Sequence, residues 1–180
     1  MLRIYVTFPE SRTIRAIGEL RHNYPYAAAL LSYVVVERVL KRYALNHWKD
    51  PSLAGARVPN KIKRHGGKQL RHLSTLTRRQ RLDQVLCEMT LGQVETLLAR
   101  PQSEKSATDR NEVMHSNLYL KEESTLSRPA QQAKNQARFD KALRHLRRAL
   151  MQFANLTIAD KDGVLVAQPN MRLKLPGAHK

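Results

Sequence analysis

Apolar residues recur at helical spacing along much of the chain. The longest such pattern lies between Ala27 and His47, with apolar residues at Ala27, Leu30, Leu31, Val34, Val35, Val39 and Tyr43. These positions share one side of a helix with 3.6 residues per turn, so the pattern predicts a helix, with Pro25 in its first turn. The alternative is a buried strand through the β-branched residues 34–36. The segment is too long for one strand and is rich in alanine at its start, which favours the helix.

The N-terminal residues follow a different pattern. Leu2 to Phe8 alternates in polarity and is rich in β-forming residues, which predicts a short strand that Pro9 ends. Ser11 can cap a helix that starts near Thr13, with one apolar face made of Ile14, Ile17 and Leu20.

Shorter helices are expected in the middle of the chain. The pattern predicts one helix over 77–88 and another after Thr90, which forms a capping box with Gln93. Pro101 is expected to end this second helix and to open a polar loop that reaches Asp109. Thr108 or Asp109 then caps the next helix.

The last helix is also the longest one predicted. It runs from Ser127, which precedes Pro129, to about Leu156. Its apolar face is formed by Ala142, Leu143, Leu146, Leu150 and Phe153. A basic stripe on the opposite side, at spacings of three and four residues, comprises Lys134, Arg138, Lys141, His145 and Arg148.

After this helix, Asp162-Gly163 between apolar residues predicts a hairpin within residues 157–175, with the N-terminal strand as a candidate neighbour. The fold class that follows is a mainly α, four- to five-helix bundle over residues 25–157, with a small β-element made from the chain ends. We expect residues 1–180 to form one domain.

The charge of the chain narrows the classes of partner. Lys and Arg number 32 against 15 Asp and Glu, a formal net charge of +17, which favours a polyanion such as RNA. Cys87 is the only cysteine, so neither an internal disulfide nor a cysteine-based zinc site can form, and no His/Asp/Glu group has the spacing of a metal site. No run of residues is apolar enough to span a membrane. We therefore expect a cytoplasmic protein without a metal or cofactor.

A long basic loop at about residues 51–77 carries part of this charge. The chain has no acidic residue between Asp50 and Asp83, and loops of this length are usually functional. The alternative is a solvated linker. The residues expected to contact RNA are Lys61, Lys63, Arg64, Lys68 and Arg71 of the loop, with Lys134, Arg138 and Lys141 of the last helix.

One short stretch combines side chains suited to RNA cleavage. Arg110 and Asn111 precede His115, expected near the start of a helix. An imidazole can take a proton from the 2′-hydroxyl or give one to the leaving oxygen, and a guanidinium can stabilise the phosphate. Five residues separate Arg110 from His115, so their directions on a helix differ by about 140°. Either the arginine curls towards the histidine or two copies of the helix bring the pairs together.

The pattern Arg110-Asn111-x-x-x-His115 resembles the signature of the HEPN superfamily, whose helical domains usually dimerise around the motif. Many members are metal-independent endoribonucleases of toxin–antitoxin and phage-defence systems. The resemblance implies that Arg110 and His115 are catalytic, with Asn111 as a polar companion and Glu37 as a supporting acid. It also implies an RNA substrate, a homodimer and an antitoxin or defence partner. The chain departs from the family at Ser116, where many members have Gly, and at Asn117, where toxins silenced by tyrosine modification have Tyr.

Other interpretations stay open. The loose pattern of Arg, four to six residues and His also occurs at Arg15–His22, Arg42–His47, Arg138–His145 and Arg172–His179, and Arg42–His47 has the same spacing as the motif. The surrounding residues therefore have to distinguish the motif from these other matches. Arg110 could instead pair with Glu112 or Asp109 and leave His115 solvated, and Glu37 could simply be exposed or paired with Arg38 or Lys41. The bundle could also bind RNA without cleaving it. A DNA-binding regulator with a helix-turn-helix over Leu82–Leu91–Leu98 is the third interpretation.

Overall fold

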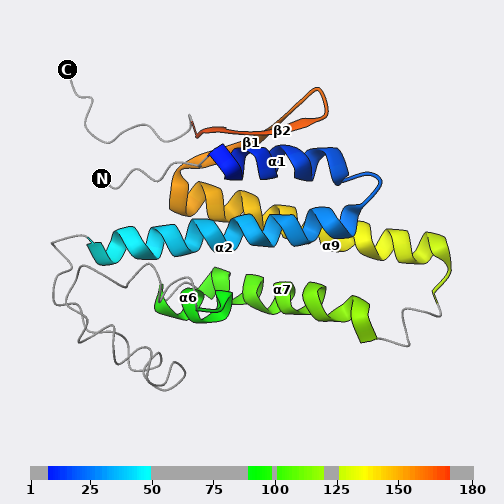
Figure 1. Ribbon diagram of the computed structural model, residues 1–180, viewed down its shortest axis with the longest axis horizontal. Coiled ribbons are helices and arrows are strands. Elements are labelled where there is room, and N and C mark those ends of the chain that lie inside the picture. Colours follow the sequence, from blue (N-terminus) through cyan, green and yellow to red (C-terminus); the bar gives the residue numbers. More distant parts are fainter. Residues whose placement is uncertain (1–7, 50–88, 99–100, 120–125, 171–180) are drawn as a thin grey trace.

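A computed structural model describes residues 8–49, 89–98, 101–119 and 126–170, which form helices and one small sheet (Figure 1). The helices are α1 (Phe8–Leu20), α2 (Pro25–Lys49), α6 (Leu91–Leu97), α7 (Pro101–Tyr119) and α9 (Arg128–Ala149), which continues into the π-helical turn η2 (Leu150–Ala154). The strands β1 (Leu156–Lys161) and β2 (Val164–Pro169) pair antiparallel. The prediction of a mainly helical chain with a small β-element is confirmed. Within the described ranges, no helix is long and apolar enough to cross a membrane.

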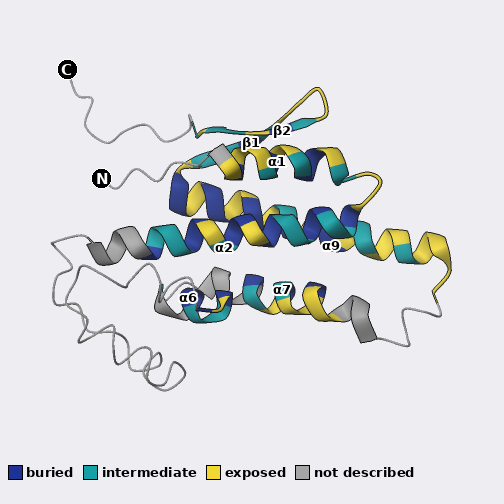
Figure 2. Cartoon of the chain, viewed as in Figure 1, coloured by how far each residue is buried: buried dark blue, intermediate teal, exposed yellow. Residues whose placement is uncertain are grey.

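Helices α2 and α9 pack against each other at the centre of the fold (Figure 1). Their buried side chains include Tyr33, Val36 and Leu40 from α2 and Leu146 and Leu150 from α9 and η2. Buried residues gather in α2 and in the C-terminal half of α9, whereas the first turns of α9 are exposed (Figure 2). The helical interpretation of 27–47 is confirmed, and the buried strand is excluded.

Helix α1 begins at Phe8, not near Thr13, so the prediction that Phe8 ends a strand and that Pro9 stops it was wrong. Proline is tolerated in the first turn of a helix because the amide that it lacks has no partner within the helix there. Glu10 of this first turn is buried and forms an ion pair with Arg42 of α2, which fixes the start of α1 on the bundle. Residues 2–7 lie outside the described part of the chain.

The β1–β2 hairpin covers α1 on the side away from α7 (Figure 1). Its two-residue turn is Asp162-Gly163, with φ values of 52° and 83°, which confirms the predicted turn and corresponds to type I′. Gly18 of α1 allows the close approach, since a Cβ there would lie 2.9 Å from the backbone nitrogen of Leu165. Arg21 also reaches Asp160 of β1 at 2.5 Å.

The predicted capping box before α6 is confirmed. The backbone amide of Thr90 donates to Gln93 Oε1 at 2.8 Å, and the amide of Gln93 donates to Thr90 Oγ1 at 3.3 Å. The basic loop at 51–77, the helix predicted over 77–88 and Cys87 lie outside the described residues, as does Leu82 of the helix-turn-helix alternative.

Candidate functional site

The central motif lies in the second half of α7, not at the start of a helix. Pro101 opens this helix instead of ending the previous one, so the predicted polar loop over 101–109 was wrong, as was the cap at Thr108 or Asp109. The inward face of α7 is largely polar, with Ser106 and Asp109 buried beside Val113. An apolar pattern was therefore absent, and the helix could not be recognised from periodicity.

Arg110 lies on the flank of α7 that faces α2. Its Nη2 atom is 3.4 Å from Glu37 Oε2, and Lys41 Nζ is 2.7 Å from the other oxygen of the same carboxylate. Arg110 thus pairs with Glu37 from another helix, and neither Glu112 nor Asp109 forms its ion pair. The side chain of Arg110 stays 30% exposed. Because a guanidinium carries five N–H donors, a single long contact leaves most of them available for a phosphate.

Asn111 and His115 occupy the outer face of α7, and both are exposed. They are four residues apart and therefore lie on the same side of the helix. Within the described part of the chain, neither side chain makes a hydrogen bond or an ion pair with another residue. The structure thus brings Arg110 and Glu37 together and directs His115 to solvent, away from Arg110 of the same chain.

Two apolar side chains flank the Arg110–Glu37 pair. Met114 lies one turn after Arg110 and is 42% exposed, and Val34 lies one turn before Glu37 and is 43% exposed. Single exposed apolar residues are common on protein surfaces. Here Val34 lies on α2 and Met114 on α7, each one helical turn from the ion pair, so exposed apolar surface lies beside it.

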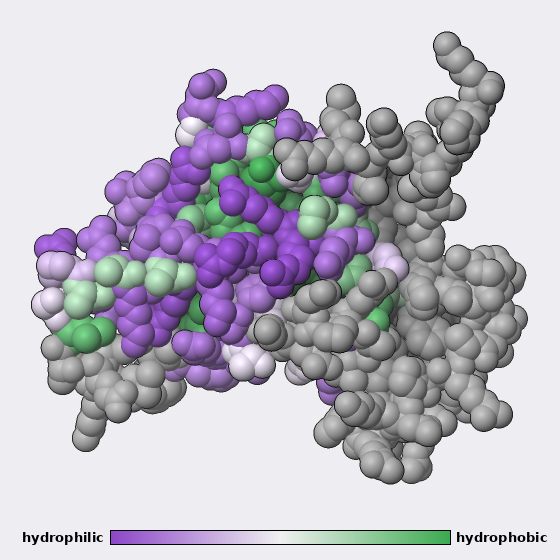
Figure 3. Space-filling model, turned by 180° about the vertical axis from the view of Figure 1, so that it is seen from behind, coloured by the Kyte–Doolittle hydropathy of each residue, from purple (hydrophilic) through white to green (hydrophobic). Residues whose placement is uncertain are grey.

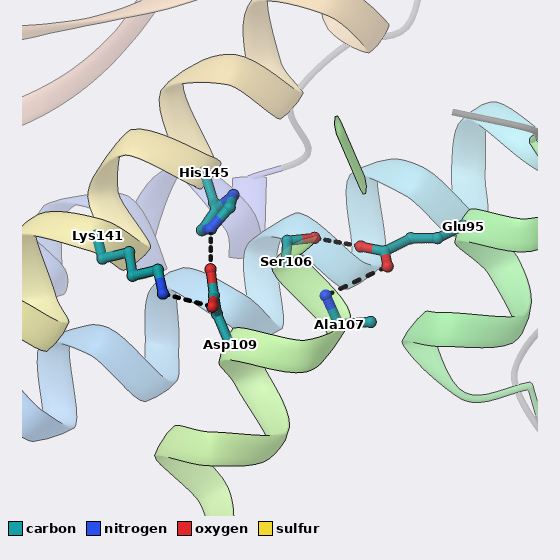
Figure 4. A network of polar contacts seen from close by, with 6 residues as sticks. All are labelled: Glu95, Ser106, Ala107, Asp109, Lys141 and His145. Carbon is teal, nitrogen blue, oxygen red and sulfur yellow. Dashed lines mark hydrogen bonds and ion pairs between the residues drawn. The ribbon is translucent and has the colours of Figure 1, made fainter. Parts of the chain in front are cut away.

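Asp109, next to Arg110 in the sequence, faces α9 instead of α2. Its carboxylate lies 2.5 Å from His145 Nε2 and 2.6 Å from Lys141 Nζ, both on α9 (Figure 4). Asp109 and His145 are each 9% exposed at the side chain. This network fixes the rotation of α7 against α9 and thereby the flank on which Arg110 emerges.

The surroundings of His145 favour its neutral form. Burial lowers the pKa of His145, and the hydrogen bond to Asp109 opposes part of that shift. The neutral ring donates its Nε2 hydrogen to the carboxylate. The ring of Tyr33 packs 5.9 Å from that of His145, and burial raises the pKa of the Tyr33 hydroxyl.

The cavity beside His145 is too small for a substrate. Its volume is about 10 Å³, and Ser106, His145 and Arg148 are among its lining residues. Such a space holds roughly one water molecule. Although an aspartate and a histidine also meet in many catalytic sites, this pair is buried between α7 and α9 beside a space for about one water molecule.

A second buried carboxylate joins α6 to α7. Glu95 is fully buried, accepts a hydrogen bond from Ser106 Oγ and lies 3.2 Å from the backbone amide of Ala107 (Figure 4). Neither Glu95 nor Asp109 was singled out in the sequence as part of a buried network. The available signal was Lys141 and His145 one turn apart on α9, which places a cation and an imidazole on one face.

The basic stripe predicted on α9 is not a solvated face throughout. Arg138 and His145 are buried, and Arg138 donates to Asn135 Oδ1 at 3.1 Å. Lys134 is exposed, and Lys141 is half-exposed while pairing with Asp109. Among the residues expected to contact RNA, Arg138 thus lies mainly within the fold. The loop residues Lys61, Lys63, Arg64, Lys68 and Arg71 lie outside the described ranges.

No group of three or more metal-binding side chains gathers within the described part of the chain. Comparisons with protein-family models, with curated proteins and with solved structures found no match to the chain. The fold and the site geometry thus define a mostly helical protein with a small antiparallel sheet, and its function has to be inferred from the site.

Proposed function

We propose that the protein is a metal-independent endoribonuclease of the HEPN type, in which two copies of the chain bring Arg110 and His115 together. The observation that carries the proposal is the arrangement on α7. Arg110 forms an ion pair with Glu37 across the contact between α7 and α2. Asn111 and His115 point outward with no partner among the described residues.

A second copy is the natural source of the missing partner for each side chain. Arg110 and His115 are about 140° apart around the helix, too far for one phosphate to contact both on a single copy. In a two-fold dimer, Arg110 of one chain can face His115 of the other. The exposed Met114 and Val34 beside Arg110 supply apolar surface of the kind found at the centre of such interfaces.

The charge of the site suits a polyanionic substrate. The whole chain carries +17, and the described surface seen from behind is mostly hydrophilic, with smaller apolar areas between (Figure 3). The Arg110–Glu37 contact is long, at 3.4 Å, and Lys41 holds the same carboxylate at 2.7 Å. A phosphate can therefore take over guanidinium donors while Lys41 continues to neutralise Glu37.

The proposed reaction is an in-line attack of the RNA 2′-hydroxyl on the adjacent phosphorus. His115 takes the hydroxyl proton or donates one to the departing 5′-oxygen, and Arg110 stabilises the charge on the non-bridging oxygens. Asn111, one turn before His115, orients the substrate. The products are a 2′,3′-cyclic phosphate and a 5′-hydroxyl, and the chemistry requires no metal.

The direct test is incubation of the full chain with RNA in the presence of EDTA, followed by mapping of the ends. We expect cleavage with cyclic phosphate ends, and we expect His115→Ala to reduce the rate by about 10²–10⁴ without loss of RNA binding. Glu19→Gln is the control, since Glu19 is also exposed but lies on α1, away from Arg110 and His115. Equal cleavage rates for wild type and His115→Ala would refute the assignment of His115 to the active site.

A non-catalytic RNA-binding module is the second candidate, favoured by the separation of Arg110 and His115 within one chain. Salt-dependent RNA binding without any cleavage by the dimer would support it. The setting implied by the HEPN resemblance is a cytoplasmic toxin–antitoxin or phage-defence system. If the protein acts as a toxin, its expression should inhibit the growth of the host cells, and the His115→Ala variant should not inhibit it.

A further inference from the structure

An open pocket of about 610 Å³ lies where the turn between α1 and α2 meets the start of α9. Polar and aromatic side chains line it, among them His22, Tyr24, Arg128, Gln131, Gln132 and Asn135. This volume is within the range of pockets that hold small organic molecules, and it is sufficient for one nucleotide.

Hydrogen bonds along α9 fix the orientation of two amide groups in this pocket. Arg138 can only donate, so its 3.1 Å contact identifies the bonded Asn135 atom as the oxygen. That oxygen also accepts from Gln131 Nε2 at 3.3 Å. Gln131 Oε1 is then left as an acceptor and Asn135 Nδ2 as a donor. The buried Arg138 thus orients pocket groups instead of contacting a backbone phosphate.

Gln131 Oε1 is buried and finds no hydrogen-bond partner among the described residues. A buried acceptor without a donor is unfavourable, so a ligand with an N–H group favours a small movement of the Gln131 side chain that brings Oε1 to the pocket surface. Nucleobases carry such groups beside acceptor atoms, which matches the neighbouring acceptor and donor of Gln131 and Asn135.

The other side chains of the pocket suit the remaining parts of a nucleotide. Tyr24 is 64% exposed, so its ring has a free face on which a base can stack. Arg128 provides a cation for a phosphate. His22 accepts from Arg21 at its Nε2 atom, so its Nδ1 hydrogen can donate.

The pocket lies at the same end of the bundle as His115. Pro25 lines the pocket, and the hydroxyl of the next residue, Tyr26, donates to the backbone carbonyl of Val113. Val113 precedes His115 by two residues on α7. A strand with one base in the pocket can therefore continue towards the outer face of α7.

We infer that this pocket binds an unpaired nucleotide of the RNA substrate, with the base stacked on Tyr24 and its edge read by Gln131 and Asn135. The inference rests on the proposed function for the identity of the strand, whereas the pocket itself stands on its own geometry. It assigns selection for single-stranded RNA to a site distinct from Arg110 and His115.

The test is a binding titration of the full chain with labelled 2′-O-methyl RNA oligonucleotides, which lack the attacking hydroxyl and stay intact. The set comprises four single-stranded homopolymers and a duplex of equal length. We expect the single strands to bind more tightly than the duplex and the four bases to differ in affinity. Tyr24→Ala should weaken single-strand binding about ten-fold, and the matched variant Tyr24→Phe should bind as wild type. Gln131→Met should remove the ranking among the bases.

Unchanged binding by Tyr24→Ala, or a duplex that binds as tightly as the single strands, would overturn the inference. A base ranking that survives in Gln131→Met would overturn the role of the amides. Adenosine monophosphate serves as a separate probe, and its binding without binding of any oligonucleotide would overturn the assignment to RNA. Because the readout is binding, Tyr24-dependent affinity in a protein that cuts no RNA would refute the nuclease and leave the pocket standing.

Discussion

His145 should make the stability of the protein depend on pH in a narrow window. The side chain is 9% exposed, and burial holds its pKa below the usual value near 6.5. As the pH falls below about 6.5, the unfolded chain binds a proton at this residue while the folded chain does not. The free energy of unfolding therefore decreases on acidification, until the pH reaches the pKa of the folded state.

The magnitude follows from linkage. One pKa unit corresponds to about 1.4 kcal/mol, so one histidine can account for a loss of at most about 1.4 kcal/mol between about pH 7.5 and pH 5.5. Asp160 has a lowered pKa through its bond to Arg21, so its contribution is lost only as the pH falls below the usual aspartate pKa of 3.8. The two residues therefore act in separate ranges of pH.

The assay is urea unfolding at several pH values for wild type and His145→Gln, which can keep a donor to Asp109. The variant should lose the decrease between about pH 7.5 and pH 5.5, while the control His115→Gln, at an exposed position, should retain it. A His145→Gln variant with the same pH dependence as wild type would refute the reasoning.

Two further predictions concern packing and the site. Gly18→Ala should lower the free energy of unfolding by about 1–2 kcal/mol, because the added Cβ would meet the Leu165 backbone at 2.9 Å. The control Gly92→Ala should be tolerated, since its Cβ meets only Ala107 at 3.6 Å. Thermal melts compare the two variants, and equal stability would count against a close α1–β2 contact. Arg110→Lys should cleave RNA more slowly than wild type, because an ammonium lacks the planar fork of a guanidinium. A wild-type rate of cleavage in this variant would show that the charge alone suffices.

The sequence predicted those elements whose signals are local. The apolar spacing of α2 and α9, the Thr90–Gln93 capping box and the Asp162-Gly163 turn each depend on residues close together in the chain. Helix α7 was only half predicted, because its inward face presents Ser106 and Asp109 and lacks an apolar period. The partners of these side chains, Glu95 and His145, belong to other helices and become visible only in the folded arrangement.

In the candidate site, too, local features could be predicted from the sequence and contacts between distant residues could not. The spacing of Arg110 and His115 was readable, and so was the angle of about 140° between them on a helix. The pairing of Arg110 with Glu37 was not readable, since 73 positions separate them and local alternatives such as Glu112 were nearer in the chain. Nor did composition reveal that Arg138 would be buried and bonded to Asn135.

Complementation between two inactive variants tests the shared site most directly. When Arg110→Ala and His115→Ala chains are mixed and allowed to exchange, a two-fold dimer with composite sites has one intact site in each mixed dimer. About half of the dimers are mixed, so cleavage should return to roughly a quarter of the wild-type rate. Mixtures as inactive as the separate variants, despite proven exchange of subunits, would contradict the account.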